Sequence, residues 1–430
     1  MDTSNDKKII ENRSQVRTVY IAYIWHGFFL ALTMSMIDLN TVFPSLISSF
    51  TSSKTLFGTL YAVMLGGPLV FNLIFSHYLA STVYKKKYLL LGIFMRAFAF
   101  LGMSLTTFFL GVSYPMLAIA VFFVWVLIFS VSAGFAGIAY ADLMGKSLES
   151  KKRTQLYAAK QFFASAASFA GGLIITGILK PGVFSFPNNY ALTLAIGFFG
   201  LLIASIGFFF IKEPASPHMA ARGKLLDYIR SVPSAVKADR ALLRFIIVEN
   251  MASFSVMVLP FYIIYARESF DLDESFVGKF LLVQVTGTIL SNLVWGYISR
   301  RSQSRVIIQV CTFTGAVIPL IALFAARVSP MVYGAVFFLL GFIVSGRLIG
   351  FEAALLDIAP PDKRTHYLGI RGTLNISIIV LPILGSIFIR LLGYEITFIL
   401  VSLIMFTASW LSRKYPNCPR GVSSDMNSQS

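Results

Sequence analysis

A short charged stretch, DLMGKSLESKKRTQLYAAK at residues 142–160, has a second copy in the chain, DIAPPDKRTHYLGIR at residues 357–371. Each copy holds an acid, then a Lys-Arg-Thr run, then a further cation seven residues after the arginine of that run. The two copies lie about half the chain apart, in corresponding places of its two halves. Self-similarity over such a distance predicts that the chain is a duplicated structural unit.

The composition places these copies in a membrane protein. Hydrophobic residues make up 57% of the chain and charged residues 13%, and the mean hydropathy is +0.76. A soluble domain carries roughly 25% charged residues, so this chain cannot keep its apolar surface from water by folding alone. The chain is long enough for about a dozen helical spans of ~20 residues with short connections.

The apolar segments predict an all-α polytopic membrane protein, with twelve transmembrane helices in two pseudo-repeated six-helix bundles. Within the polar linker, Leu225–Arg230 predicts either a short amphipathic helix on the membrane surface or an ordinary turn. The predicted parts are an N-terminal segment 1–17, a first bundle 18–212, a linker 213–240, a second bundle 241–413 and a tail 414–430.

The distribution of basic residues predicts the orientation. Most of the 36 Lys and Arg residues fall in one set of connections, together with both chain ends. Because such residues stay on the cytoplasmic side, we expect a multi-pass protein of the plasma or inner membrane with both termini in the cytoplasm. Basic loops against anionic lipid also account for the net charge of +17, so no nucleic-acid partner is expected.

These features resemble the major facilitator superfamily over about residues 18–413. The resemblance rests on six plus six spans, a central linker, and basic loops after spans 2, 4, 8 and 10. The family's loop between spans 2 and 3 typically reads Gly-x-x-x-Asp-Arg-x-Gly-Arg-Arg. The corresponding segments here, Ser76–Ala80 and Gly296–Arg301, both lack the aspartate. The fifth span has Gly171-Gly172 without the Gly-Pro pair of the drug-antiporter signature. The resemblance implies an alternating-access transporter, not an enzyme, whose spans 1, 4, 7 and 10 line the cavity.

The repeated charged stretches predict gating residues. Asp142 and Asp357 end spans 4 and 10, and Lys160 and Arg371 lie about one turn inside spans 5 and 11. We expect each acid to pair with the cation of its own copy, and the pair to brace one half or to lock the halves together. The alternative is that both cations extend to the lipid headgroups.

Ionisable residues deep inside spans are the candidates for a substrate site, because each costs roughly 2.5–3.5 kcal/mol to insert. We predict Arg347, His26 and Asn250 as substrate-binding residues, since an arginine can hold a carboxylate or phosphate through two hydrogen bonds. We predict Glu249 and Glu352 as proton-coupling residues. A permanent Glu249–Arg347 ion pair and a structural, hydrogen-bonded His26 are the alternatives.

The sequence therefore predicts a secondary transporter for a small polar or anionic organic solute, coupled to protons. We expect a monomer in contact with lipid, without a cofactor or a bound metal. Asp38, near the outer end of span 1, is expected to face water, with a role as cap or gate of the outer vestibule as the alternative, and Arg96 in span 3 needs a partner that the sequence does not identify. The alternative functions are efflux of amphipathic or drug-like compounds, a non-transporting receptor or scaffold, and a membrane-embedded enzyme.

Overall fold

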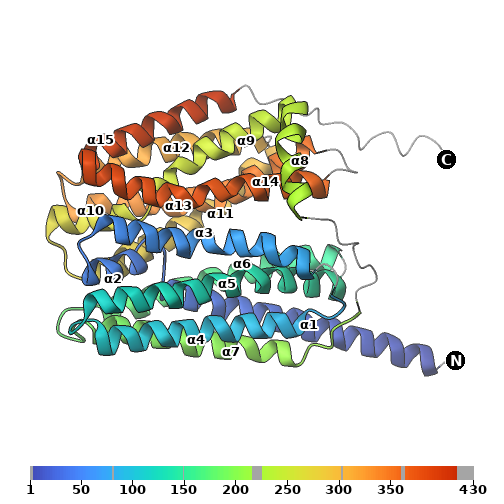
Figure 1. The fold of residues 1–430 in the computed structure, drawn as a ribbon. Coiled ribbons are helices and arrows are strands. Elements are labelled where there is room, and N and C mark those ends of the chain that lie inside the picture. The colour runs from blue at the N-terminus through green and yellow to red at the C-terminus, as the bar shows by residue number, and fades with distance from the viewer. Residues whose placement is uncertain are drawn as a thin grey trace.

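The computed structural model describes residues 3–79, 82–148, 150–215, 225–301, 304–359 and 364–413, and within these ranges the chain forms helices and turns. The first bundle contains α1 (Thr3–Ser35), α2 (Val42–Phe50), α3 (Lys54–Leu79), α4 (Lys86–Leu110), α5 (Pro115–Ser147), α6 (Ser150–Ile178) and α7 (Asn188–Phe209). Helix α8 (Leu225–Ala238) connects it to the second bundle, which contains α9 (Arg240–Ser253), α10 (Phe261–Phe270), α11 (Ser275–Arg301), α12 (Ser304–Ala325), α13 (Pro330–Ile358), α14 (Arg364–Leu374) and α15 (Leu381–Ser412). The two bundles lie side by side (Figure 1).

Eleven segments of the described chain are long and apolar enough to cross a membrane. The last of them, Ile370–Ser412, holds two helices that meet at Gly393, where a φ of 80° favours a residue without a Cβ. The predicted twelve spans in two bundles are therefore confirmed. Helix α8 confirms a helix in the linker, whereas the predicted tail 414–430 and Lys363 of the second charged stretch lie outside the described residues.

Three spans are interrupted, the seventh and the eleventh near their middle and the first toward its distal end. The first span breaks between α1 and α2, the seventh between α9 and α10 and the eleventh between α14 and α15, the last two through 3-10 turns at Phe254–Met257 and Asn375–Val380. Pro44 lies in the first turn of α2, where a missing N–H is tolerated. Interrupted backbone at membrane depth is tolerated where protein or a water-filled cavity satisfies its polar groups. The breaks therefore mark where a polar site can lie.

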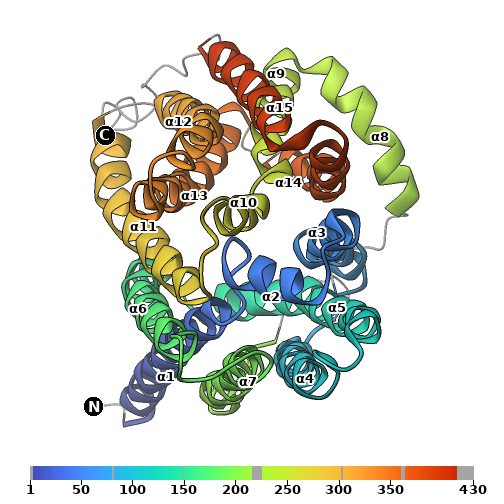
Figure 2. The same ribbon diagram turned by 90° about the vertical axis from the view of Figure 1, so that its left-hand side faces the viewer.

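The two bundles contact each other through α6 packed on α11 and α3 packed on α15. Gly58 of α3 permits this approach, because an added Cβ there would come within 2.7 Å of the Pro382 carbonyl oxygen. We call the end of the molecule that carries α2 and α10 the distal end, and the end where α1 begins and α15 ends the terminal end (Figures 1 and 2).

Candidate functional site

A cavity of about 210 Å³ lies between the two bundles. Its walls come from α1 and α6 of the first bundle and from α11 of the second. Its polar lining consists of Ser35, Asp38, Gln161, Ser165, Ser168, Gln284 and Thr288. A concave site with a few convergent polar groups is the usual form of a small-molecule site.

Asp38 lies at the distal side of this cavity, at the break between α1 and α2. One carboxylate oxygen accepts hydrogen bonds from the backbone N–H of Asn40 at 2.9 Å and from the Thr41 hydroxyl at 2.8 Å. The other accepts from Gln284 Nε2 of the second bundle at 3.2 Å. All these donors are neutral, and no cation among the described residues pairs with Asp38. The expectation that Asp38 faces water at the outer end of span 1 is wrong, because the break turns it toward the cavity between the bundles.

Lys160 does not itself line the cavity but lies on α6 one residue before the lining residue Gln161, toward the terminal end. Its side chain crosses α1 at Gly27, where an added Cβ would come within 2.6 Å of Lys160 Cγ. The ammonium nitrogen lies 4.8 Å from the centroid of the Tyr140 ring. Within the described part of the chain Lys160 has no carboxylate partner, so its charge is held by an aromatic face.

A second charged cluster lies inside the second bundle. Arg371 of α14 forms an ion pair with Glu249 of α9, with Nη2 at 2.7 Å from Oε1. Arg347 of α13 donates to the carbonyl of Ala252 at 3.1 Å and to the hydroxyl of Ser255 at 2.8 Å, where α9 ends. The alternative of a direct Glu249–Arg347 ion pair is therefore wrong: Glu249 is paired with Arg371, and Arg347 satisfies backbone and hydroxyl oxygens at the break in span 7.

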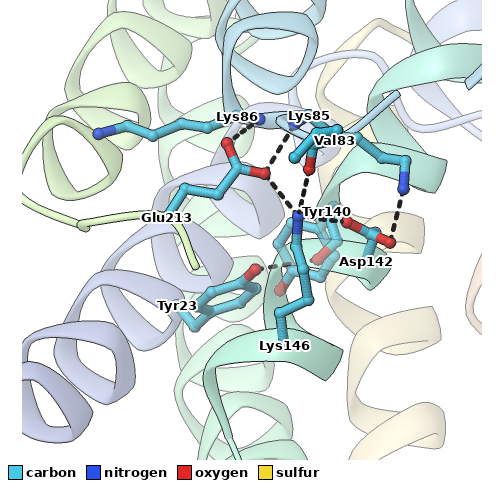
Figure 3. A network of polar contacts seen from close by, with 8 residues as sticks. All are labelled: Tyr23, Val83, Lys85, Lys86, Tyr140, Asp142, Lys146 and Glu213. Carbon is cyan, nitrogen blue, oxygen red and sulfur yellow. Dashed lines mark hydrogen bonds and ion pairs between the residues drawn. The ribbon is translucent and has the colours of Figure 1, made fainter. Parts of the chain in front are cut away.

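Asp142 of the first charged stretch belongs to a network at the terminal end (Figure 3). Its carboxylate forms ion pairs of 2.8 Å with Lys85, which directly precedes α4, and with Lys146, four residues further along α5. Lys146 also lies 2.7 Å from Glu213, which accepts hydrogen bonds from the backbone amides of Lys85 at 2.6 Å and Lys86 at 2.9 Å. The network ties α4, α5 and the end of α7 together within one bundle.

The predicted pairing inside each charged stretch is therefore wrong. Asp142 pairs with Lys85 and Lys146 while Lys160 lies over Tyr140. Asp357 accepts a hydrogen bond from Ser304 at 2.7 Å, while Arg371 pairs with Glu249. The physical reason is that Asp142 lies close to Lys85, before α4, and to Lys146 on its own helix, while Arg371 lies close to Glu249 of span 7. Each observed pair braces one bundle.

The other predicted site residues are dispersed. His26 is 4% exposed, its Nδ1 lies 3.3 Å from the carbonyl of Ala204, and its ring packs against Tyr140 and Phe208, so it serves contacts within the first bundle. Asn250 donates to the carbonyl of Ile246 on its own helix at 3.0 Å. Glu352 is exposed on α13 and belongs to neither cluster.

Polar contacts that the sequence did not indicate join the bundles at the distal end. Arg267 of α10 donates to the hydroxyl of Ser45 at 2.6 Å and to that of Ser48 at 3.3 Å, both on α2. Asn189 of α7 donates to Glu274, which precedes α11. Lys54 lies 3.7 Å from Glu268. These contacts, together with those of Asp38, join the two bundles near the distal end.

The sequence and the architecture were compared with those of known proteins. The family model of the Major Facilitator Superfamily matches residues 245–425. No curated protein matches the sequence. A mutant of the nucleoside transporter NupG superposes with a TM-score of 0.70 at 13% identity, over 93% of this chain and 100% of that one. The xylose transporter XylE from E. coli, in a partially occluded inward open conformation, gives 0.70 at 12% identity, over 95% and 100%.

A POT family transporter in complex with a thioalcohol conjugated peptide gives a TM-score of 0.67 at 10% identity, over 92% of this chain and 94% of that one. At these identities the superpositions show a shared fold, and the family match over the second bundle adds the sequence relationship. The second bundle thus matches the family model of the Major Facilitator Superfamily, and the chain as a whole has the fold of these solved transporters.

Proposed function

We propose that the protein moves a small organic anion across the membrane by alternating access, with the cavity between the bundles as its substrate site. The observation that carries the proposal is Lys160. Its ammonium group lies inside a span, over the Tyr140 ring, on the residue that precedes the cavity-lining Gln161, and no carboxylate of the described residues neutralises it. A cation at membrane depth is costly without a partner. An anion in the cavity would supply that partner.

Two further cations lie inside the bundles, away from the lining of the cavity. The guanidinium of Arg96 lies 5.1 Å from the Phe129 ring, and its Nε is buried without a hydrogen-bond partner among the described residues. Arg347 contacts neutral oxygens only. Of these interior cations and Arg371, only Arg371 has a carboxylate partner in the described chain. The surplus of positive charge favours an anion over a neutral or cationic substrate.

The distal contacts support a closed distal gate in this conformation. Arg267 holds α10 of the second bundle on α2 of the first, and Asp38 and Gln284 join α1 to α11 below it. Access to the cavity in this state would then be from the terminal end. With the orientation that the basic loops predict, this is the cytoplasmic side. Opening the distal end requires these contacts to break, so together they can contribute only a few kcal/mol.

We propose Asp38 as the site that couples transport to protons. Its partners are neutral, so only a proton or a cation can neutralise its charge. Gain of a proton changes its bond to Gln284, which belongs to the distal closure. Glu249 was the sequence-based candidate, but its charge is already balanced by Arg371. Glu352 is exposed on α13 and does not line the cavity.

A zwitterion is the second candidate substrate. Asp38 lines the cavity, Lys160 directly precedes its lining residue Gln161 on α6, and glutamine, serine and threonine side chains form the polar lining. A ligand with an ammonium group at one end and a carboxylate at the other would meet both charges. An anion bound near Lys160 leaves the Asp38 carboxylate free to take up a proton. The ammonium group of a zwitterion would pair with that carboxylate instead.

Thermal unfolding of the purified protein with a panel of ligands tests the proposal. The panel contains organic acids, their neutral amides, amino acids and hydrophobic cations. A ligand at about 100 times its dissociation constant stabilises by ~2.7 kcal/mol. We expect acids to stabilise the protein and their amides not to, with the effect lost in Lys160→Met but kept in Lys152→Met, which removes an exposed cation of the same helix. Stabilisation by hydrophobic cations alone, equal in both variants, would instead indicate efflux of amphipathic compounds.

A further inference from the structure

A groove of about 440 Å³ runs along the outer surface of the first bundle, between α1 and α7. Figure 2 shows these two helices on the side of the first bundle that faces away from the second. The groove is lined almost entirely by apolar side chains, among them Ile21, Ala22, Trp25, Ile206, Gly207 and Phe210. In a membrane this surface faces the lipid acyl chains.

Small residues on both helices create the groove. An added Cβ at Gly207 would come within 3.0 Å of Ala22 Cα, so the two backbones lie close together at its floor. Trp25 forms a wall, and its indole N–H donates to the carbonyl of Ile203 at 2.7 Å. That bond satisfies the polar atom and leaves the ring exposed to 41%. Phe210, 70% exposed, forms the opposite wall.

Two cations lie next to the lining residues at the terminal end of the groove. Helices α1 and α7 are antiparallel, with Ala22 opposite Gly207. At the terminal end, Arg17 directly precedes the lining residue Thr18, and Lys212 follows the lining residue Phe210 by two residues. Both side chains are exposed, and neither forms an ion pair with a described residue.

The nearby charged groups are already bound elsewhere. Glu213 accepts from the amides of Lys85 and Lys86 and pairs with Lys146. The ammonium group of Lys86 donates to the carbonyl of Ile211 at 2.6 Å, at the end of α7. Arg17 and Lys212 are thus left as a pair of cations beside an apolar groove, at the depth where a basic patch meets lipid headgroups.

We propose that this groove binds an anionic phospholipid, with an acyl chain between α1 and α7 and the phosphate between Arg17 and Lys212. The apolar walls match the chain, and the two cations match a headgroup with a net negative charge. A zwitterionic lipid would fill the same groove without the charge complementarity. The bound lipid would hold the terminal ends of α1 and α7 together.

Native mass spectrometry of the purified protein tests the proposal, with phosphatidylglycerol and phosphatidylcholine of identical acyl chains as probes. A cation near the headgroups contributes about 1 kcal/mol, or about a fivefold change in affinity. The double variant Arg17→Gln/Lys212→Gln should therefore lose roughly 30-fold in affinity for phosphatidylglycerol and little for phosphatidylcholine. Filling the groove with Ile206→Trp should weaken both lipids.

The matched control is Arg240→Gln/Arg244→Gln, which removes two exposed cations at the terminal end of the second bundle. It should keep the preference for phosphatidylglycerol. Equal affinity of the wild type and Arg17→Gln/Lys212→Gln for phosphatidylglycerol would overturn the proposal. So would a dimer mass that excludes lipid and is lost in Ile206→Trp, because the groove would then hold a second copy of the chain.

Discussion

Arg371 directs two nitrogen atoms to one oxygen of Glu249 and leaves the other oxygen unpaired. Nε and Nη2 lie 2.8 Å and 2.7 Å from Oε1, whereas Oε2 is buried without a hydrogen-bond partner in the described structure. The pair connects α14 to α9, each of which precedes the break in its span. It therefore holds two interrupted spans of the second bundle in place.

Replacing Glu249 by glutamine should destabilise the protein strongly. The change leaves the guanidinium of Arg371 without its counter-charge, and breaking a buried pair from one side costs about 3–5 kcal/mol. The double variant Glu249→Gln/Arg371→Met removes both charges and should recover most of the loss. Thermal unfolding of the single and double variants measures the coupling. A single variant as stable as the wild type would show that the pair is not a brace.

Removing the side chain of Arg267 should open the distal end more often. Arg267→Ala deletes the donors to Ser45 and Ser48 and so weakens the contact of α10 with α2. With Ser165→Cys as a reporter in the cavity, a membrane-impermeant thiol reagent added from the distal side should react faster. Arg327→Ala is the control, because its exposed pair with Glu395 lies within one bundle. Equal acceleration in both variants would contradict a gate at Arg267.

Neutralising Asp38 should separate substrate exchange from proton-driven accumulation. Asp38→Asn keeps acceptors for Thr41 and Asn40 but carries no titratable group. In proteoliposomes it should exchange substrate across the membrane yet fail to accumulate it when a pH gradient is imposed. Asp271→Asn, which changes an acid at the distal surface, should accumulate substrate normally. If Asp38→Asn accumulates substrate and Glu249→Gln or Glu352→Gln does not, the coupling site lies at that glutamate.

Asp239 should make the stability of the protein acid-sensitive. Burial raises the pKa of Asp239, but hydrogen bonds from Tyr367 and from the amides of Leu242 and Ala241 lower the pKa by more, and it falls below its usual value. A carboxyl whose pKa is lower in the folded state stabilises fully above its unfolded pKa of about 3.9, and this contribution is lost as the pH falls through the lowered value. Asp239→Asn should show a shallower decrease in Tm below about pH 4. An unchanged decrease would contradict a stabilising role for the ionised cap.

The fold was accessible from the sequence because hydropathy and repetition act over long segments. A span needs only about 20 apolar residues, and the two charged stretches marked corresponding loops. The helix breaks were not predicted, since apolar composition continues through them. Asp38, Asn40 and Thr41 carried a signal, because short polar side chains favour turns and helix starts over a helix interior.

The partners of the charged residues could not be predicted from spacing alone. Asp142 and Lys160 are near in sequence, but the lysine crosses α1 at Gly27 toward Tyr140. Lys85, which precedes Asp142 by 57 residues in the chain, donates a hydrogen bond to its carboxylate. Histidine is a residue type that often binds substrates, but the ring of His26 lies beside the carbonyl of Ala204 on α7 and contacts its own bundle. Which face of a helix a side chain occupies depends on tertiary packing, which periodicity in a uniformly apolar span does not reveal.

Uptake by proteoliposomes of an organic acid that stabilises the protein, measured beside its neutral amide, tests the central claim most directly. The wild type should transport the acid and not the amide. Lys160→Met should lose at least about tenfold in affinity for the acid, as expected for a charge-assisted hydrogen bond of about 1.5–3 kcal/mol. Lys152→Met should transport the acid like the wild type. Equal transport of acid and amide, or an unchanged affinity in Lys160→Met, would contradict the assignment of the cavity as an anion site.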